Sequence, residues 1–183
     1  DLKPMWNIIG HQRVLEGLDR ALAAGRLAQA YLLVGPAGTG KATLALALAR
    51  AVNCLQPQPG PCGECPQCRR IAGGLHPDVT VTEVEGGRRV LSIEQVRELQ
   101  HSLSLRPFEG RCRVAVLPEA DRLTPEASNA LLKTLEEPAP DTLLILCAGD
   151  EADILPTIRS RCQTITLLPV PTGVIAEIGR AHV

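Results

Sequence analysis

The stretch that decides the fold is Tyr31-Leu32-Leu33-Val34-Gly35-Pro36-Ala37-Gly38-Thr39-Gly40-Lys41-Ala42-Thr43. Its apolar start indicates a buried strand, its glycines indicate a turn, and the residues after Lys41 indicate a helix. In that context the G-x-x-x-x-G-K spacing is typical of a loop that cradles phosphate groups. Backbone N–H groups converge on the anion, while the helix N-terminus and the lysine add positive charge. We therefore predict a nucleotide-binding loop that includes every residue from Gly35 to Thr43.

One residue of this loop departs from the usual pattern. A Ser or Thr normally follows the lysine and binds Mg²⁺ through its hydroxyl, but Ala42 occupies that position. Thr43 cannot simply replace it, because the next position of a helix is turned by about 100°. Since the backbone N–H groups and Lys41 remain, we expect weak binding of ATP or ADP that tolerates Mg²⁺ without depending on it. A glycine-rich turn that binds no ligand is the alternative.

The composition restricts the class of protein. A chain of 183 residues, 45% of them apolar, suits one large domain or one domain plus a fragment. The net charge of −1, with Lys and Arg spread along the chain, gives no basic surface for unaided nucleic-acid binding. Because no apolar run approaches about 18 residues and the first residues do not resemble a signal peptide, we expect a cytoplasmic protein without membrane contact.

Four of the seven cysteines lie within fifteen residues. Cys62, Cys65 and Cys68 form two C-x-x-C steps that share the middle cysteine, and Cys54 lies eight residues upstream. Such steps bring thiolates to the spacing of a tetrahedral Zn²⁺ site. The prolines and glycines between them leave the loop without a core of its own, so that a metal would fold it. We predict a structural four-cysteine zinc site, with a redox C-x-x-C pair and an iron–sulfur cluster as alternatives.

The rest of the chain alternates strands and helices. Helices are expected over 12–24, 42–52, 68–73, 92–103, 124–137 and 155–159, and strands over 31–34, 78–84, 111–117, 143–147 and 163–168. Ser92 and Thr124 are expected to cap their helices, with Pro125 at the first helical position.

The end of the strand 111–117 is the second place where chemistry is expected, because ligands of doubly wound sheets bind beyond the carboxyl ends of strands. An ATPase of this class has Asp-Glu there, the Asp for Mg²⁺ and the Glu for the attacking water. This chain has Pro118 in place of the metal-side carboxylate and retains Glu119 as a vestigial base. Asp121 lies further along and is expected to cap a helix or to form an ion pair.

Two further motifs carry a family resemblance. The string Asn129-Ala130-Leu131-Leu132-Lys133-Thr134-Leu135-Glu136-Glu137-Pro138 and the triplet Ser160-Arg161-Cys162 join the glycine-rich loop and the cysteine cluster. Together they resemble the bacterial clamp-loader subunits of DNA polymerase III, of the AAA+ class, from Ile8 to about Leu168. Within that family the chain looks more like the delta-prime branch than the tau/gamma motor branch. The opening residues 9–31 and residues 91–99 match delta-prime, and Ala42, Pro118 and Ala148-Gly149 replace groups that motors use for hydrolysis.

The resemblance implies an α/β architecture. Residues 1–168 would form a P-loop AAA+ base domain, a five-stranded parallel sheet with helices on both faces, with the zinc module inserted at 54–68. Residues 169–183 would begin a helical lid, and a helical collar would follow in the family. The chain is therefore expected to be part of a longer protein.

The resemblance also implies a function. Arg161 would act in trans as an arginine finger at the ATP site of a neighbouring motor subunit, because a planar and permanently charged guanidinium suits a phosphoryl transition state. The partners would be the tau/gamma and delta subunits and, through the complex, the sliding clamp and primer–template DNA. The alternative for Arg161 is a surface ion pair next to Arg159.

Two competing functions remain open. The chain could be an active ATPase of the tau/gamma type, in which Thr43 and Asp121 recruit the metal. It could instead be a zinc-ribbon nucleic-acid binder that uses Arg69 and Arg70, although its net charge is unfavourable for that role.

Overall fold

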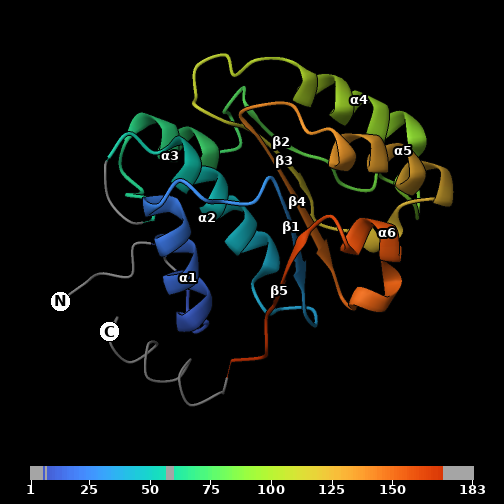
Figure 1. Ribbon diagram of the computed structural model, residues 1–183, viewed down its shortest axis with the longest axis horizontal. Coiled ribbons are helices and arrows are strands. Elements are labelled where there is room, and N and C mark those ends of the chain that lie inside the picture. Colours follow the sequence, from blue (N-terminus) through green and yellow to red (C-terminus); the bar gives the residue numbers. More distant parts are fainter. Residues whose placement is uncertain (1–5, 7, 57–59, 171–183) are drawn as a thin grey trace.

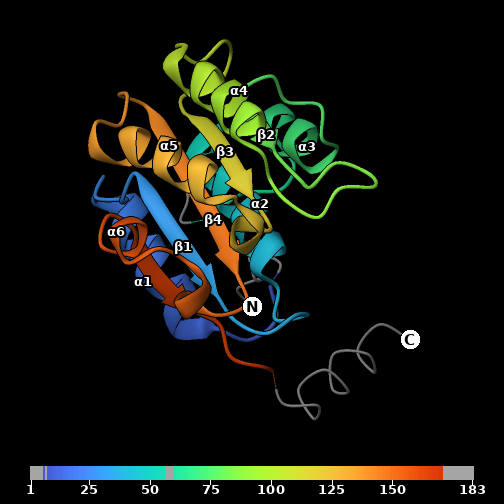
Figure 2. The same ribbon diagram turned by 90° about the vertical axis from the view of Figure 1, so that its right-hand side faces the viewer.

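The computed structural model describes residues 6, 8–56 and 60–170. A five-stranded sheet runs through its centre in the order β2-β3-β4-β1-β5, and every strand pairing is parallel (Figures 1 and 2). The strands are β1 (Ala30–Val34), β2 (Val79–Val81), β3 (Arg113–Leu117), β4 (Thr142–Ala148) and β5 (Gln163–Thr166). The α-helices are α1 (Gln12–Ala23), α2 (Lys41–Asn53), α3 (Pro66–Ala72), α4 (Ile93–Ser104), α5 (Pro125–Glu136) and α6 (Pro156–Arg159). Two short 3₁₀ turns, η1 (Ala120–Arg122) and η2 (Glu151–Asp153), complete the described elements.

Helices cover both faces of the sheet, as the α/β prediction requires (Figure 1). On one face α1 and α2 pack on Tyr31 and Leu33 of β1, and on the other α4 and α5 pack on Leu32 and Val34. Successive residues of a strand point to opposite faces, so each central strand contributes to two cores and reads as a continuous apolar run. The strands β1 and β4 are buried along their whole length.

Local sequence signals set the helix starts on the second face. The Ser92 side chain accepts from the Gln95 backbone N–H, and the Gln95 side chain accepts from the Ser92 N–H, which forms a capping box. The Thr124 hydroxyl accepts from the Ala127 N–H, and Pro125 occupies the first turn. Both predicted caps are confirmed.

Several predicted boundaries differ from the structure. The strand expected over 78–84 spans only Val79–Val81, because this edge strand pairs with β3 alone and its chain then turns away toward α4 and η1. The strand expected to reach Leu168 ends at Thr166, and α3 begins at Pro66, where the Cys65 side chain caps it. The expected start of a lid at 169–183 falls mostly outside the described residues.

None of the described helices is both long and apolar enough to span a membrane. The strand order places β1 between β4 and the edge strand β5, so the loop that follows β1 emerges at the sheet's carboxyl edge, one strand in from β5.

Candidate functional site

The glycine-rich loop lies at the carboxyl end of β1, between β4 and β5. The Gly35 N–H donates to the Ala148 carbonyl at the end of β4 (3.2 Å). A Cβ at Gly35 would press into the Leu167 carbonyl oxygen and lie 2.9 Å from Thr39 Oγ1, so this position requires glycine. Gly38 and Gly40 have φ values of 81° and 89°, in the left-handed region that favours glycine. The backbone therefore has the curled path of a phosphate cradle.

The side chains of the loop hold it in this shape. Lys41 donates from Nζ to the Gly35 carbonyl and, at 3.0 Å, to the Pro36 carbonyl. Thr39 is buried and donates from its hydroxyl to Pro36 O (2.8 Å), while His11 Nε2 lies 3.2 Å from Thr39 O. His11 was missed by sequence reasoning, and only its position before a helix marks it. An incoming phosphate must draw the Lys41 ammonium away from the loop carbonyls.

Among the described residues, the positions at which the usual Mg²⁺-binding groups are expected carry other side chains. Ala42 and Thr43 are exposed on the first turn of α2, and the residues that follow β4 are Ala148 and Gly149, which have no polar side chain. Pro118 follows β3 directly. The described residues therefore suit a phosphate group better than a phosphate–magnesium complex.

Glu119, the residue after Pro118, makes a hydrogen bond to a neighbouring backbone segment. Its Oε2 accepts from the Val84 N–H at 3.3 Å, on the segment that follows β2. Asp121 lies exposed in η1, and the described part of the chain offers it neither a side-chain hydrogen bond nor an ion pair. The expectation that Asp121 caps a helix or forms an ion pair is therefore wrong, because η1 turns this side chain into solvent.

The four clustered cysteines converge at the end of α2. Their sulfur atoms all lie within 4.8 Å of one another, and Cys62 Sγ lies 4.0 Å from Cys68 Sγ. Ligand sulfurs of a tetrahedral zinc site lie about 3.8 Å apart, given a Zn–S distance of about 2.3 Å. This donor set and its spacing fit a structural Zn²⁺ ion, and Cys54, Cys62, Cys65 and Cys68 would hold it.

Backbone N–H groups surround these sulfurs. The Cys62, Cys65 and Cys68 N–H groups donate to Sγ atoms of the cluster at 3.3–3.4 Å. Burial opposes ionisation of Cys65, but backbone donors from Leu55 and Cys68 together with the neighbouring thiols outweigh it and lower the pKa of Cys65 to about 6. At Cys65 these donors favour the thiolate, which is the metal-binding form, whereas burial raises the pKa of the Cys54 and Cys68 thiols.

Arg161 lies at the opposite end of the sheet from the loop. It precedes β5, and the first residue of β5, Gln163, pairs with Tyr31 near the start of β1. The Arg161 guanidinium donates from Nη1 to Thr157 O (2.9 Å), and its Nη2 lies 3.2 Å from Glu136 Oε1. The surface ion pair considered as an alternative therefore exists, and it leaves more than a third of the Arg161 side chain exposed.

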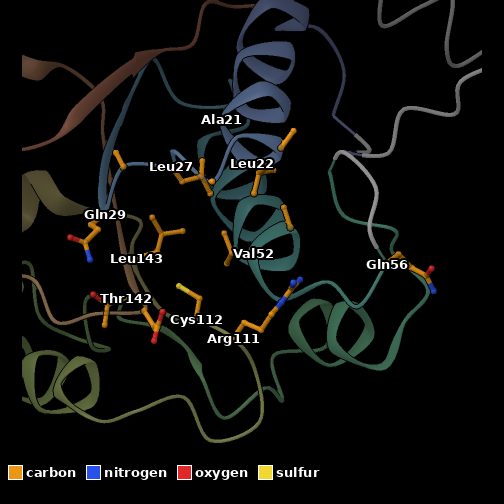
Figure 3. Close-up of a pocket in the computed structure, with 15 residues that line it drawn as sticks. Ala21, Leu22, Leu27, Gln29, Val52, Gln56, Arg111, Cys112, Thr142 and Leu143 are labelled. Carbon is orange, nitrogen blue, oxygen red and sulfur yellow. The ribbon is translucent and has the colours of Figure 1, made fainter.

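The amino ends of the strands also border two cavities. One, of about 240 Å³, is lined by Arg161, Gln163, Thr134 and Gln29 among others. The other, of about 590 Å³, lies between the ends of α1 and α2, with Leu22, Val52, Cys112 and Arg111 along its walls (Figure 3). Neither of these two cavities is lined by residues of the glycine-rich loop.

A match to a known family accompanies this geometry. The family model described as "DNA polymerase III, delta subunit" matches residues 10–171. The chain belongs to this DNA polymerase III family. The resemblance inferred from the N-A-L-L-K-T-L-E-E-P string and from Ser160-Arg161-Cys162 is thereby confirmed.

Curated relatives agree with the family match. The chain is 38% identical over 167 residues to DNA polymerase III subunit delta' of Bacillus subtilis, covering 90% of this chain and 50% of the relative. It is 41% identical over 156 residues to subunit delta' of Pseudomonas aeruginosa, covering 84% and 48%. It is also 37% identical over 168 residues to subunit gamma/tau of Mycobacterium bovis, covering 90% and 29%. The chain thus spans about half the length of these delta' relatives and less than a third of the gamma/tau relative.

Solved structures share the fold of this family member. A gamma subunit-related protein of Thermotoga maritima aligns with a TM-score of 0.68 at 22% identity, over 91% of this chain and 49% of that one. The RuvB Holliday junction branch migration motor of the same organism aligns with a TM-score of 0.58 at 21% identity, over 93% and 49%. The predicted α/β architecture, a five-stranded parallel sheet with helices on both faces, is confirmed.

Proposed function

We propose that the full-length protein is a delta-prime-like stator of the DNA polymerase III clamp loader. In this role it completes the ATP site of a neighbouring motor subunit, and the complex loads the sliding clamp onto primer–template DNA during replication. The tau/gamma and delta subunits would be its direct partners. Membership of the family and the relatives named delta' support the proposal.

The observation that carries the proposal is the position of Arg161. The arginine precedes β5, at the amino ends of the strands, whereas the phosphate loop follows β1 at their carboxyl ends. The three residue steps from Tyr31 to Val34 alone separate these levels by about 10 Å, at about 3.3 Å per residue. An arginine finger at this place can serve only a nucleotide bound to another subunit.

The candidate site itself argues against strong catalysis by this chain. Ala42, Pro118 and Ala148 stand where a motor needs a hydroxyl, a carboxylate and a polar sensor, and Glu119 is engaged with the Val84 N–H. We infer that ATP or ADP binds weakly, through the loop amides and Lys41, without a requirement for Mg²⁺. The four-cysteine cluster would hold a structural Zn²⁺ that folds the loop after α2.

The gamma/tau relatives make an ATP-hydrolysing motor the competing function. In that case activity would reside in the protein itself, and Lys41→Ala would abolish it. The zinc-ribbon reading has less support, because the net charge of −1 is unfavourable for nucleic-acid binding.

The test combines the full-length protein with its cognate motor subunit. We expect Arg161→Ala to lower the DNA-stimulated ATPase rate of the complex by at least about 100-fold, while the complex still assembles. Arg26→Ala is the matched control, because Arg26 is exposed and its substitution removes the same charge. An intact ATPase rate in an assembled Arg161→Ala complex would rule out the stator proposal.

A further inference from the structure

We propose that Glu136 is a positioning residue for Arg161: it orients the guanidinium at this subunit's surface before the neighbour's nucleotide arrives. The inference deepens the proposed function and rests on it, because it assigns a role in finger placement to a second side chain. Glu136 comes from the N-A-L-L-K-T-L-E-E-P string, for which sequence reasoning offered a family resemblance but no chemical task.

The geometry around the guanidinium supports this role. Glu136 Oε1 lies 3.2 Å from Arg161 Nη2, and Thr157 O accepts from Nη1 at 2.9 Å. The two acceptors thus engage the two terminal nitrogens and define the plane of the group. A guanidinium has five N–H donors, so several remain available for phosphate oxygens after these contacts are made.

Both acceptors are carried by packed elements. Glu136 is the last residue of α5, whose preceding residue Leu135 is buried. Gln100 of α4 donates from Nε2 to Ala130 O (2.7 Å) and to Thr134 Oγ1 (3.0 Å), which fixes the final turns of α5 against α4. The backbone from which the Glu136 carboxylate extends is therefore held in place by packing.

The second acceptor is anchored in the same way. Thr157 belongs to α6, and its neighbour Ile158 is 1% exposed. An arginine held by two fixed acceptors loses less rotamer freedom when it meets a phosphate than a freely moving one does. Pre-orientation of this kind acts on the rate of the chemical step.

The strength of the contact fits a side chain that must change partners. The side chains of Glu136 and Arg161 are 50% and 36% exposed, so their attraction is screened by solvent and weak. A phosphoryl group carries more negative charge than one carboxylate and can attract the guanidinium without breaking a strong bond. The pair thus orients Arg161 without trapping it.

The experiment uses the full-length protein in complex with its motor subunit. We expect Glu136→Gln to lower the kcat of DNA-stimulated ATPase by about 2- to 5-fold with little change in KM, as the loss of a weak orienting contact predicts. Glu137→Gln is the matched control, because it makes the same charge change at the next exposed residue, which is not ion-paired with Arg161. An unchanged or raised kcat for Glu136→Gln would overturn the proposal.

A double mutant separates positioning from an independent effect. In an Arg161→Ala background, Glu136→Gln should have no further effect on kcat, because its action runs through the arginine. If Glu136→Gln lowers the rate equally with and without Arg161, the carboxylate acts elsewhere and the proposal is wrong.

A second readout distinguishes this inference from the stator proposal. In the NMR spectrum of the isolated full-length protein, the Arg161 Nε–Hε signal should show more motion in Glu136→Gln than in the wild type and in Glu137→Gln, because only the contact to Thr157 O remains unchanged. Equal mobility in all three overturns the positioning role even if Arg161→Ala abolishes ATPase. The expected difference in motion together with an intact Arg161→Ala ATPase rate instead refutes the stator proposal alone.

Discussion

At the scale of single residues, Ala42 is the position at which the loop of this chain departs from the usual phosphate-loop pattern. The cradle itself is intact, with Gly35 required by the approach of Leu167 O and with Gly38 and Gly40 at positive φ. What Ala42 lacks is the hydroxyl that ties Mg²⁺ to the loop. Binding of the nucleotide and binding of the metal are therefore expected to be uncoupled here.

This uncoupling predicts that nucleotide affinity is the same with Mg²⁺ and with EDTA. Titration calorimetry with ADP should give dissociation constants within about twofold of each other, because Mg²⁺ adds no contact to the protein. Lys41→Ala should weaken binding about tenfold or more, the loss of a charged hydrogen bond being worth about 1.5–3 kcal/mol. Strict Mg²⁺ dependence of the wild type would contradict the prediction.

At the scale of elements, the module that follows α2 depends on contacts of two kinds. One is the four-cysteine cluster, whose sulfurs converge within 4.8 Å. The other is Asn53, the last residue of α2. Its Oδ1 accepts from the Arg111 and Cys112 N–H groups and its Nδ2 donates to Cys112 O, which joins the end of α2 to the start of β3.

The cluster predicts one Zn²⁺ ion per chain. Metal analysis of the purified protein should find about one equivalent, and Cys68→Ser should lose it, because this buried residue is one of the four proposed ligands. EDTA should lower the melting temperature of the wild type, since metal binding contributes to folding. Cys112→Ser lies outside the four-cysteine cluster and should keep the metal. Iron in place of zinc in the wild-type protein would favour the iron–sulfur alternative.

A buried carboxylate fixes the loop before β3. Asp78 is 1% exposed and accepts from the N–H groups of Phe108, Glu109 and Gly110 at 2.6–2.9 Å, with Arg113 Nη2 at 3.7 Å. Burial acts to raise the pKa of Asp78, but the three N–H donors and the guanidinium outweigh it and hold that pKa below its usual value. Sequence reasoning missed this residue, because a single Asp before a strand is a weak signal.

The depressed pKa predicts a contribution of Asp78 to stability that is present above the unfolded pKa of about 3.9. As the pH falls below that value toward the folded pKa, the unfolded state binds the proton first and the contribution is lost. Asp78→Asn should lower the free energy of unfolding by about 2–4 kcal/mol at pH 7. It should also make that free energy depend less on pH in the acid range. Urea unfolding from pH 3 to 7 measures both effects.

Asp121→Asn is the control for that series, because Asp121 is exposed in η1. It should leave the unfolding free energy within about 0.5 kcal/mol of the wild type. If the free energy of unfolding falls equally steeply with acid pH in Asp78→Asn and in the wild type, other carboxylates govern the acid transition.

At the scale of the whole molecule, the sheet separates the glycine-rich loop from Arg161, the proposed arginine finger. The phosphate loop lies at the carboxyl edge and Arg161 at the amino edge, so one copy of the chain cannot bring them together. Hydrolysis would need a second subunit on at least one side.

This separation predicts that the isolated full-length protein is a poor ATPase. Turnover with Mg²⁺ should stay far below about 1 s⁻¹, the low end of ordinary enzyme rates. A coupled ADP-release assay at increasing protein concentration tests it, with the cognate motor subunit as the positive control. Turnover near 1 s⁻¹ that Lys41→Ala abolishes would instead identify a motor.

The sequence by itself determined the elements that depend on neighbours in the chain. The strand–glycine–helix of the phosphate loop, the caps at Ser92 and Thr124 and the C-x-x-C spacing are local patterns, and the structure contains all of them. The physical reason is that turn chemistry, capping and periodicity act over a few residues.

Only the tertiary structure decided which distant residues meet. Asp78 reaches residues 108–110, Asn53 reaches Cys112, and Glu136 reaches Arg161 because the order β2-β3-β4-β1-β5 brings their loops together. The parallel direction of β1 and β5 places Arg161, which precedes β5, at the edge away from the loop that follows β1. Such pairings depend on how the layers pack rather than on spacing in the chain, and sequence patterns do not encode them locally.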